Sequence, residues 1–218
     1  PGEISLAHHG ILFLDELPEF SRQVLESLRE PLESGHVTIS RAGFQTIFPA
    51  HFQLIAAMNP CPCGFFGSPR VTCHCSNEQI KRYLLRLSGP LLDRIDMQVE
   101  VPALPPALLS ASDSLPREES KTVKARVALA EKCQIDRQGK SNRDLLVGEL
   151  QQFCTLDEKA QQLLDQVMNK FNLSARVYHR IVKVARTIAD ISSQNSISSD
   201  HISEALSYRS LDRSRLMI

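Results

Sequence analysis

Two short apolar runs, each followed by polar side chains, constrain the fold of this chain more than any other feature. Residues 9–16 run through Gly-Ile-Leu-Phe-Leu into Asp15 and Glu16, and residues 51–58 end just before Asn59. Runs of this length and composition predict buried parallel strands. Because ligands of open α/β sheets bind beyond the carboxyl ends of the strands, the acids after the first run are candidates for a functional site.

The segment between the two runs predicts a helix followed by a hairpin. Ser21 can cap a helix that Gly35 ends, and Pro31 predicts a kink in it. Residues 37–40 and 44–48 are rich in β-formers on either side of Arg41-Ala42-Gly43, which places Arg41 at or beside a hairpin tip. Strands joined through a helix and a hairpin indicate an α/β sheet.

The rest of the chain predicts the end of the sheet and then helices alone. Ser76 and Gln79 form a capping box for a helix, and the alternation within 95–101 predicts a half-buried strand at a sheet edge. We expect a sheet domain over residues 1–101, a proline-rich linker over 102–116 and an all-helical domain over 117–218. The expected helices lie near 117–135, 145–153, 156–171, 174–191 and 200–208, with cap candidates Thr155, Ser174 and Ser199.

Composition narrows the class of protein. Of the 218 residues 42% are hydrophobic and 23% charged, as in ordinary globular proteins. Because 25 basic residues balance 25 acidic ones, any DNA contact must be local. The sequence has no apolar run that could cross a bilayer and no leader, so we expect a cytoplasmic protein without a membrane partner. It begins at Pro1 without an initiator Met, and we expect it to be a piece of something longer.

Asp15, Glu16 and Asn59 fit the chemistry of phosphoryl transfer to water. An acid at the end of a strand can hold Mg²⁺, as in a Walker B segment, and the next acid can polarise the attacking water. Asn59 could sense the γ-phosphate or position that water. The alternatives are a strand running into a capped turn and, for Asn59, the start of the turn before Pro60.

Two arginines are candidates for contact with nucleotide. Arg94 lies in residues 89–96, which resemble the "LLxRFD" box of AAA+ proteins, and is a candidate arginine finger; the alternative is an ion pair with Asp93 or Asp96. Arg176 opens a predicted helix, where positive charge is disfavoured without an anionic partner, and it resembles a sensor 2 arginine. Arg180 and Arg186 on the same helix are weaker candidates.

The cysteines suggest a metal site. Four of the six fall in the spacing Cys61-x-Cys63 and Cys73-x-Cys75. Tetrahedral Zn²⁺ accepts such a set, and His74 could replace one thiol; free thiols in a loop are the alternative. Cys133 and Cys154 are expected to be ordinary buried thiols.

The order and spacing of residues 10–16, 38–43, 56–63, 88–96 and 173–190 resemble the magnesium-chelatase-like ComM/YifB family over nearly the whole chain. The resemblance implies a partial AAA+ parallel-sheet core with a β-hairpin insertion, followed by an all-α helical lid domain. It implies ATP and Mg²⁺ as cofactors, a ring of subunits, here expected to be a hexamer, and branch-migration or helicase-like work on single-stranded or branched DNA in transformation and recombination. The hairpin resembles the pre-sensor hairpin of MCM helicases, which makes Arg41 a DNA-contacting candidate.

Two other functions stay open at this point. One is a chelatase-type motor that remodels a protein during metal insertion, and the other is a non-enzymatic scaffold. The sequence holds no Gly-x-x-x-x-Gly-Lys-Ser/Thr loop, which ATP hydrolysis requires. We therefore expect that loop upstream and no ATPase activity from this chain alone.

Overall fold

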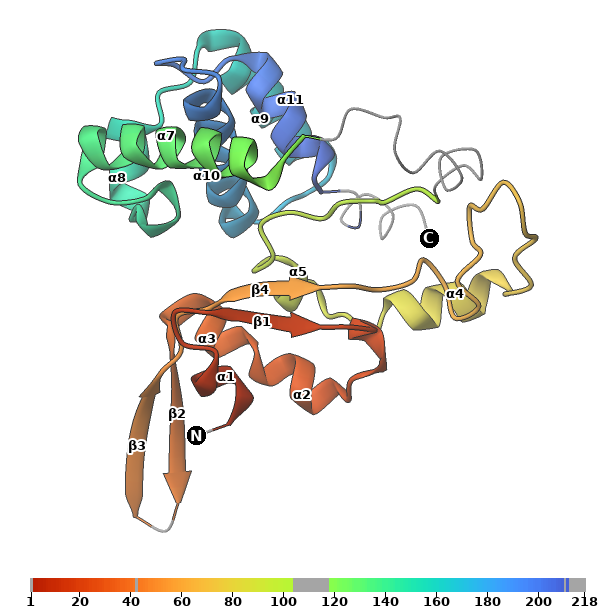
Figure 1. Ribbon diagram of the computed structural model, residues 1–218. Coiled ribbons are helices and arrows are strands. Elements are labelled where there is room, and N and C mark those ends of the chain that lie inside the picture. Colours follow the sequence, from red (N-terminus) through yellow and green to blue (C-terminus); the bar gives the residue numbers. More distant parts are fainter. Residues whose placement is uncertain (1, 42, 104–117, 210, 212–218) are drawn as a thin grey trace. The chain divides into compact units, whose positions relative to one another are not determined.

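The computed structural model describes residues 2–41, 43–103, 118–209 and 211 (Figure 1). It is a mixed α/β structure with a small parallel sheet and a helical C-terminal region. The chain divides into two compact units, residues 1–95 and 96–218. Most of the proline-rich segment, residues 104–117, lies outside the described residues. No helix in the described ranges combines the length and the apolar character needed to cross a membrane.

The first unit contains the predicted parallel strand pair. Strand β1 (Ile11–Leu14) lies beside β4 (Gln53–Ala56), with Leu14 opposite Ala56 in the register. Between them come η1 (Leu17–Glu19), α2 (Arg22–Ser27) and α3 (Arg29–Ser34). The predicted helix is broken at Leu28, not at Pro31, because proline is tolerated in the first turn of α3.

Both strands were predicted to be buried, and for one face of the sheet this prediction is wrong. Ile11 and Phe13 each keep 60% of their surface exposed, whereas Leu12 and Leu14 are half-buried. In the described residues β1 and β4 form a sheet of two strands, and the buried side chains of the unit come instead from its helices and turns. Those fully buried include Leu17, Leu25, Leu28, Ile80, Leu87 and Leu91.

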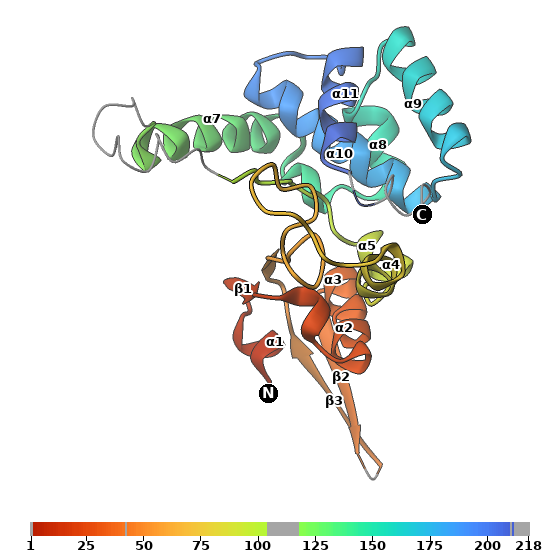
Figure 2. The ribbon, with the colours of Figure 1, turned by 90° about the vertical axis from the view of Figure 1, so that its right-hand side faces the viewer.

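The predicted hairpin is confirmed. Strands β2 (His36–Arg41) and β3 (Phe44–Pro49) pair antiparallel, with Arg41 opposite Phe44 next to the tip. Gly43, at φ 86°, supplies the left-handed backbone that the turn needs. Both views show the hairpin extending away from β1 and β4 as a two-stranded arm (Figures 1 and 2).

The other helices described in the first unit are short. Helix α1 (Glu3–Leu6) precedes β1, and α4 (Asn77–Leu84) and α5 (Gly89–Leu92) follow β4. The predicted capping box of α4 is confirmed: the Ser76 hydroxyl accepts from the Gln79 N–H, and the Gln79 amide oxygen accepts from the Ser76 N–H.

The predicted strand over 95–101 is wrong. These residues make one isolated bridge, in which the Gln98 N–H donates to the Tyr208 carbonyl at 2.7 Å. Gln98 is buried while Met97, Val99 and Val101 are exposed, the reverse of the expected pattern. The reason is that the Gln98 side chain also accepts the Leu211 N–H at 2.9 Å, so a polar side chain, not an apolar one, anchors the segment.

The second unit is a helical bundle around α10 (Ala175–Ile191). Its other helices are α7 (Ser120–Gln138), η2 (Asn142–Asp144), α8 (Val147–Phe153), α9 (Glu158–Lys170) and α11 (Ser199–Ser207). The five predicted helical ranges are confirmed. Helix α10 contributes most to the core, through Val177, Ile181, Val182 and Ala185. Ser174 caps it as predicted, but Asp157 caps α9 in place of Thr155, and Ser198 caps α11 in place of Ser199.

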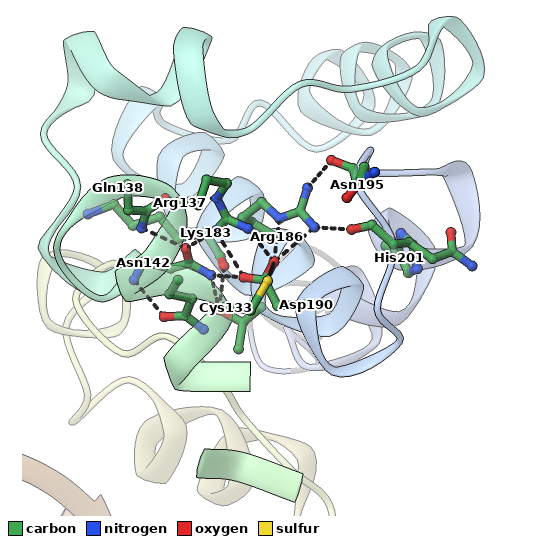
Figure 3. Close-up of polar contacts among 12 residues, drawn as sticks. Cys133, Arg137, Gln138, Asn142, Lys183, Arg186, Asp190, Asn195 and His201 are labelled. Carbon is green, nitrogen blue, oxygen red and sulfur yellow. Dashed lines mark hydrogen bonds and ion pairs between the residues drawn. The ribbon is translucent and has the colours of Figure 1, made fainter. Parts of the chain in front are cut away.

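A buried polar network ties α7, η2 and α10 together (Figure 3). The Asp190 carboxylate is fully buried and accepts from Arg186, Arg137 and Asn142, the last at 2.8 Å. These hydrogen bonds raise the pKa of Arg137. Arg186 also donates to the carbonyls of Gln194 and Asn195. Arg186 is therefore bound inside the bundle, whereas its neighbour Arg180 pairs with Asp96.

Candidate functional site

The register of β1 and β4 brings their carboxyl ends to one edge of the sheet. The Ala57 N–H donates to the Leu14 carbonyl at 2.9 Å, and the Leu17 N–H donates to the Ala57 carbonyl at 2.9 Å. These bonds continue the ladder past both strand ends. Asp15 and Glu16 follow β1 directly and Asn59 lies three residues beyond β4, so the polar residues of both runs emerge at the same edge.

Asp15 and Glu16 are both exposed there. One Asp15 carboxylate oxygen accepts the Glu16 N–H at 2.9 Å. Glu16 has a left-handed backbone (φ 50°, ψ 45°), a conformation that costs a non-glycine residue about 1–3 kcal/mol and gathers at functional sites. Mg²⁺ binds through one or two carboxylates together with waters and phosphates. The exposed pair, with one Asp15 oxygen still available, fits that requirement.

Asn59 sits beside the loop that follows it. A Cβ built on Gly64 would lie 3.8 Å from the Asn59 side chain, so the two residues are neighbours. The Asn59 backbone also forms a hydrogen bond with Tyr83 of α4; this bond lowers the pKa of Tyr83, whereas burial, the larger effect, raises it. Asn59 therefore lies beside both α4 and the loop that follows it.

Arg86 is a supporting residue that sequence reasoning missed. Its guanidinium donates to the Pro18 carbonyl at 3.1 Å and to Glu19 at 2.7 Å. It therefore ties the segment after α4 to the turn that follows Asp15 and Glu16. No motif marks it, because its partners lie more than sixty residues away in the sequence.

Arg94 lies away from solvent in this structure. Its side chain is 8% exposed, pairs with Glu33 and donates to the Pro90 carbonyl at 2.7 Å. Of the two predicted alternative partners, Asp96 pairs with Arg180. Its Nε has no hydrogen-bond partner among the described residues, so the guanidinium is incompletely satisfied in this position.

The remaining basic candidates lie on different elements. Arg176 is exposed in the first turn of α10, within the second unit. The backbone of Arg41 lies at the end of β2, and its side chain lies outside the described residues. Across the register from it, Phe44 is 81% exposed. Phe44 is a second candidate that sequence reasoning missed, although its place after Gly43 was a usable signal.

The four clustered cysteines converge. The sulfur of Cys61 lies 3.4 Å from that of Cys63 and 3.7 Å from that of Cys73, and all four sulfurs, including that of Cys75, lie within 4.8 Å of one another. Backbone N–H groups of the loop lower the pKa of the Cys63 thiol to about 6. His74 is not a member of the group. Cys154 is buried as predicted, but Cys133 is exposed, contrary to expectation.

Comparison with known proteins agrees with this architecture. The family description "Magnesium chelatase, subunit ChlI" matches residues 1–109, and "Magnesium chelatase, subunit ChlI C-terminal" matches residues 117–209. These two matches define the class, a magnesium-chelatase-like protein of AAA+ type.

Individual relatives identify the family within this class. The chain is 49% identical over 213 residues to Uncharacterized protein YifB of Escherichia coli, covering 98% of the chain and 42% of that protein. It is 50% identical to Competence protein ComM of Haemophilus influenzae, covering 98% of the chain and 41% of that protein. The chain belongs to the magnesium-chelatase-like ComM/YifB family, and it spans about two fifths of the length of these curated relatives.

A more distant likeness covers less than half of the chain. DNA replication licensing factor mcm2 of Schizosaccharomyces pombe is 30% identical over 96 residues, which is 44% of this chain and 10% of that protein.

Proposed function

We propose that this chain forms part of an ATP-hydrolysing AAA+ motor that acts on DNA. The observation that carries the proposal is the β1–β4 register, with Leu14 opposite Ala56, which puts two carboxylates and Asn59 at one sheet edge. Membership of the ComM/YifB family supports the ATPase activity, and the similarity to Competence protein ComM and to DNA replication licensing factor mcm2 supports the link to DNA.

The proposed roles at the edge follow from the chemistry of the side chains. Asp15 holds the Mg²⁺ that neutralises charge on the ATP phosphates, and Glu16 orients and polarises the attacking water. Asn59 hydrogen-bonds the γ-phosphate or that water. Arg176 contacts the nucleotide from the helical lid.

Arg94 is the proposed arginine finger. In the ring, expected to be a hexamer, it would exchange Glu33 for the γ-phosphate held by a neighbouring subunit. A finger supplies about 10³–10⁵ in rate where it acts. Its unsatisfied Nε in the Glu33-bound position is compatible with such an exchange.

The hairpin is the proposed DNA contact. Arg41 at the end of β2 would neutralise a backbone phosphate, and the exposed Phe44 ring opposite it would stack on an unpaired base. One cation per subunit binds weakly, but a ring of hairpins would form a positive collar. This arrangement favours single-stranded or branched DNA over an intact duplex, whose bases are already stacked.

The experiment is the ATPase rate of the full-length protein with and without single-stranded and branched DNA. Stimulation by DNA is expected, and a Glu16→Gln variant should lose at least about 100-fold in rate, since general-base catalysis contributes about 10²–10⁴-fold. Arg41→Ala should lower the ratio of DNA-stimulated to unstimulated rate, whereas Lys124→Ala, on the exposed surface of α7, should not.

A chelatase-type remodeller of proteins is the second candidate, and the match of both family descriptions to magnesium chelatase favours it. An ATPase rate that does not change with DNA but rises with a metal-inserting partner protein would support this second function. The 218-residue chain itself, which lacks the phosphate loop, should show no turnover; magnesium-dependent hydrolysis by the purified chain would contradict this.

A further inference from the structure

The loop over residues 61–75 brings four thiols into a geometry that free cysteines have no reason to adopt. The sulfur of Cys61 lies 3.4 Å from that of Cys63 and 3.7 Å from that of Cys73, and the sulfurs of Cys63 and Cys73 are 3.5 Å apart. A disulfide needs about 2.05 Å between sulfurs, so these are not disulfide pairs. A tetrahedral Zn²⁺ with Zn–S bonds of about 2.3 Å requires edges of about 3.8 Å, and the observed separations lie close to that value.

We infer that Cys61, Cys63, Cys73 and Cys75 bind one Zn²⁺ ion in a closed tetrathiolate site that fixes the loop beside Asn59. The inference stands apart from the proposed ATPase, because it rests on the thiols alone. Soft thiolate ligands select zinc over magnesium or calcium. Four protein ligands leave no open position for substrate, so the ion is structural and not catalytic.

The backbone of the loop is arranged to support such a site. The Phe66 N–H donates to the Cys61 sulfur at 3.3 Å, an interaction that favours the thiolate form that metals bind. Gly64 and Gly67 take left-handed backbone conformations, at φ 81° and 79°, and so let the chain turn between the two cysteine pairs. Cys61, whose sulfur accepts this hydrogen bond, is fully buried.

The cysteine loop begins next to Asn59, so an ion bound there would also affect the sheet edge. Cys61 follows Asn59 by two residues, and a Cβ added at Gly64 would lie 3.8 Å from the Asn59 side chain. An ion that closes the loop would therefore restrain the residues next to Asn59. Nine residues separate Cys63 from Cys73, and the ion would join the two ends of that segment.

The test uses the 218-residue chain purified under reducing conditions, with metal content measured by mass spectrometry. About one zinc per chain is expected for a structural site. Cys73→Ser should lower the zinc content at least about tenfold, as loss of a ligand requires. Cys133→Ser is the matched control, because Cys133 is an exposed thiol outside the group; it should keep its zinc.

Alkylation keeps the test informative if Cys73→Ser fails to fold. In the intact chain we expect a thiol reagent to modify Cys133 and to spare the four cysteines of the group until a chelator is added. Trypsin cleavage after Arg70, which lies between the two cysteine pairs, should likewise appear only after chelation. Zinc below about half an equivalent, or equal alkylation of the four cysteines with and without chelator, would overturn the inference.

Discussion

The two units of this chain are stabilised in different ways. The second has a continuous core, in which Leu164, Val177, Ile181 and Ile202 are almost fully buried, and a polar network closed around Asp190. In the first, the β1–β4 sheet has two strands and exposed apolar side chains, and the buried side chains come from helices and turns. The candidate site residues Asp15, Glu16 and Asn59 all belong to the less covered unit.

This contrast indicates that stability and function depend on different parts of the chain. A filled helical core tolerates little change, because lost contacts are not replaced. A sheet edge served by loops can present polar groups to a ligand, since those groups are not needed for packing. The following predictions test whether the two units really respond differently, beginning with the largest expected effect.

Asp190→Asn should destabilise the second unit by about 3–5 kcal/mol, because it leaves Arg186 buried without a counter-ion. Urea unfolding followed by circular dichroism would measure the loss. Glu118→Gln, which removes the partner of Arg126 in an exposed pair, is the control and should cost about 0–1 kcal/mol. Hydrogen exchange should show the Asp190→Asn loss in α10 and not in β4; equal losses in both would remove the contrast between the units.

Gly35→Ala should destabilise the first unit by about 1–3 kcal/mol. Gly35 has φ 72°, and an added Cβ would meet the His51 ring at 2.1 Å. Gly139→Ala in the second unit is the matched control, with φ 74° and open space around the Cβ position; it should cost about 1–2 kcal/mol from backbone strain alone.

In a His51→Ala background the costs of Gly35→Ala and Gly139→Ala should converge, as measured by thermal unfolding. If Gly35→Ala remained much the costlier of the two, the contact with the ring would not be the cause.

The smallest effect concerns pH. Burial, and then the nearby Lys183, lower the pKa of His179 below its ordinary value of 6.5. The unfolded chain therefore takes up more protons than the folded one as pH falls through 6.5, and the second unit should lose stability on acidification and regain it as pH rises. Thermal midpoints measured across this range should show a shallower slope in His179→Gln; an unchanged slope would assign the dependence to other groups.

Local patterns predicted the elements of both units well. The apolar runs, the hairpin, the Ser76 capping box and the five helical ranges each depend on residues close in sequence. The errors came from contacts between distant residues. The alternation of 95–101 did not reveal that Gln98 bonds Tyr208 and Leu211, and nothing in the sequence around Arg94 marked Glu33, 61 residues away, as a partner.

The roles of the candidate site residues stay predictions. Motif spacing named the acids at the sheet edge and the cysteine group, because the members of each set lie close together in the sequence. Arg86 was missed because its partners lie more than sixty residues away, whereas Phe44 was missed although it lies three residues from Arg41, its partner in the hairpin. Roles that need a neighbouring subunit, such as that of Arg94, are proposals beyond the geometry of one chain.

The proline-rich segment was expected to link the sheet domain to the helical domain. The hydrogen bond between Gln98 and Tyr208 indicates that the residues before this segment belong with the helices. Asp96 and Gln98, which precede it, and the helices that follow it belong to the same unit. The described residues on either side of 104–117 therefore belong to one unit. The entropy of closing a chain segment between two fixed ends rises by only about 0.6 kcal/mol for each doubling of its length. Insertions or deletions there should alter the stability of the helical unit only slightly, and shortened versions of this chain should keep residues 96–101 with the helices.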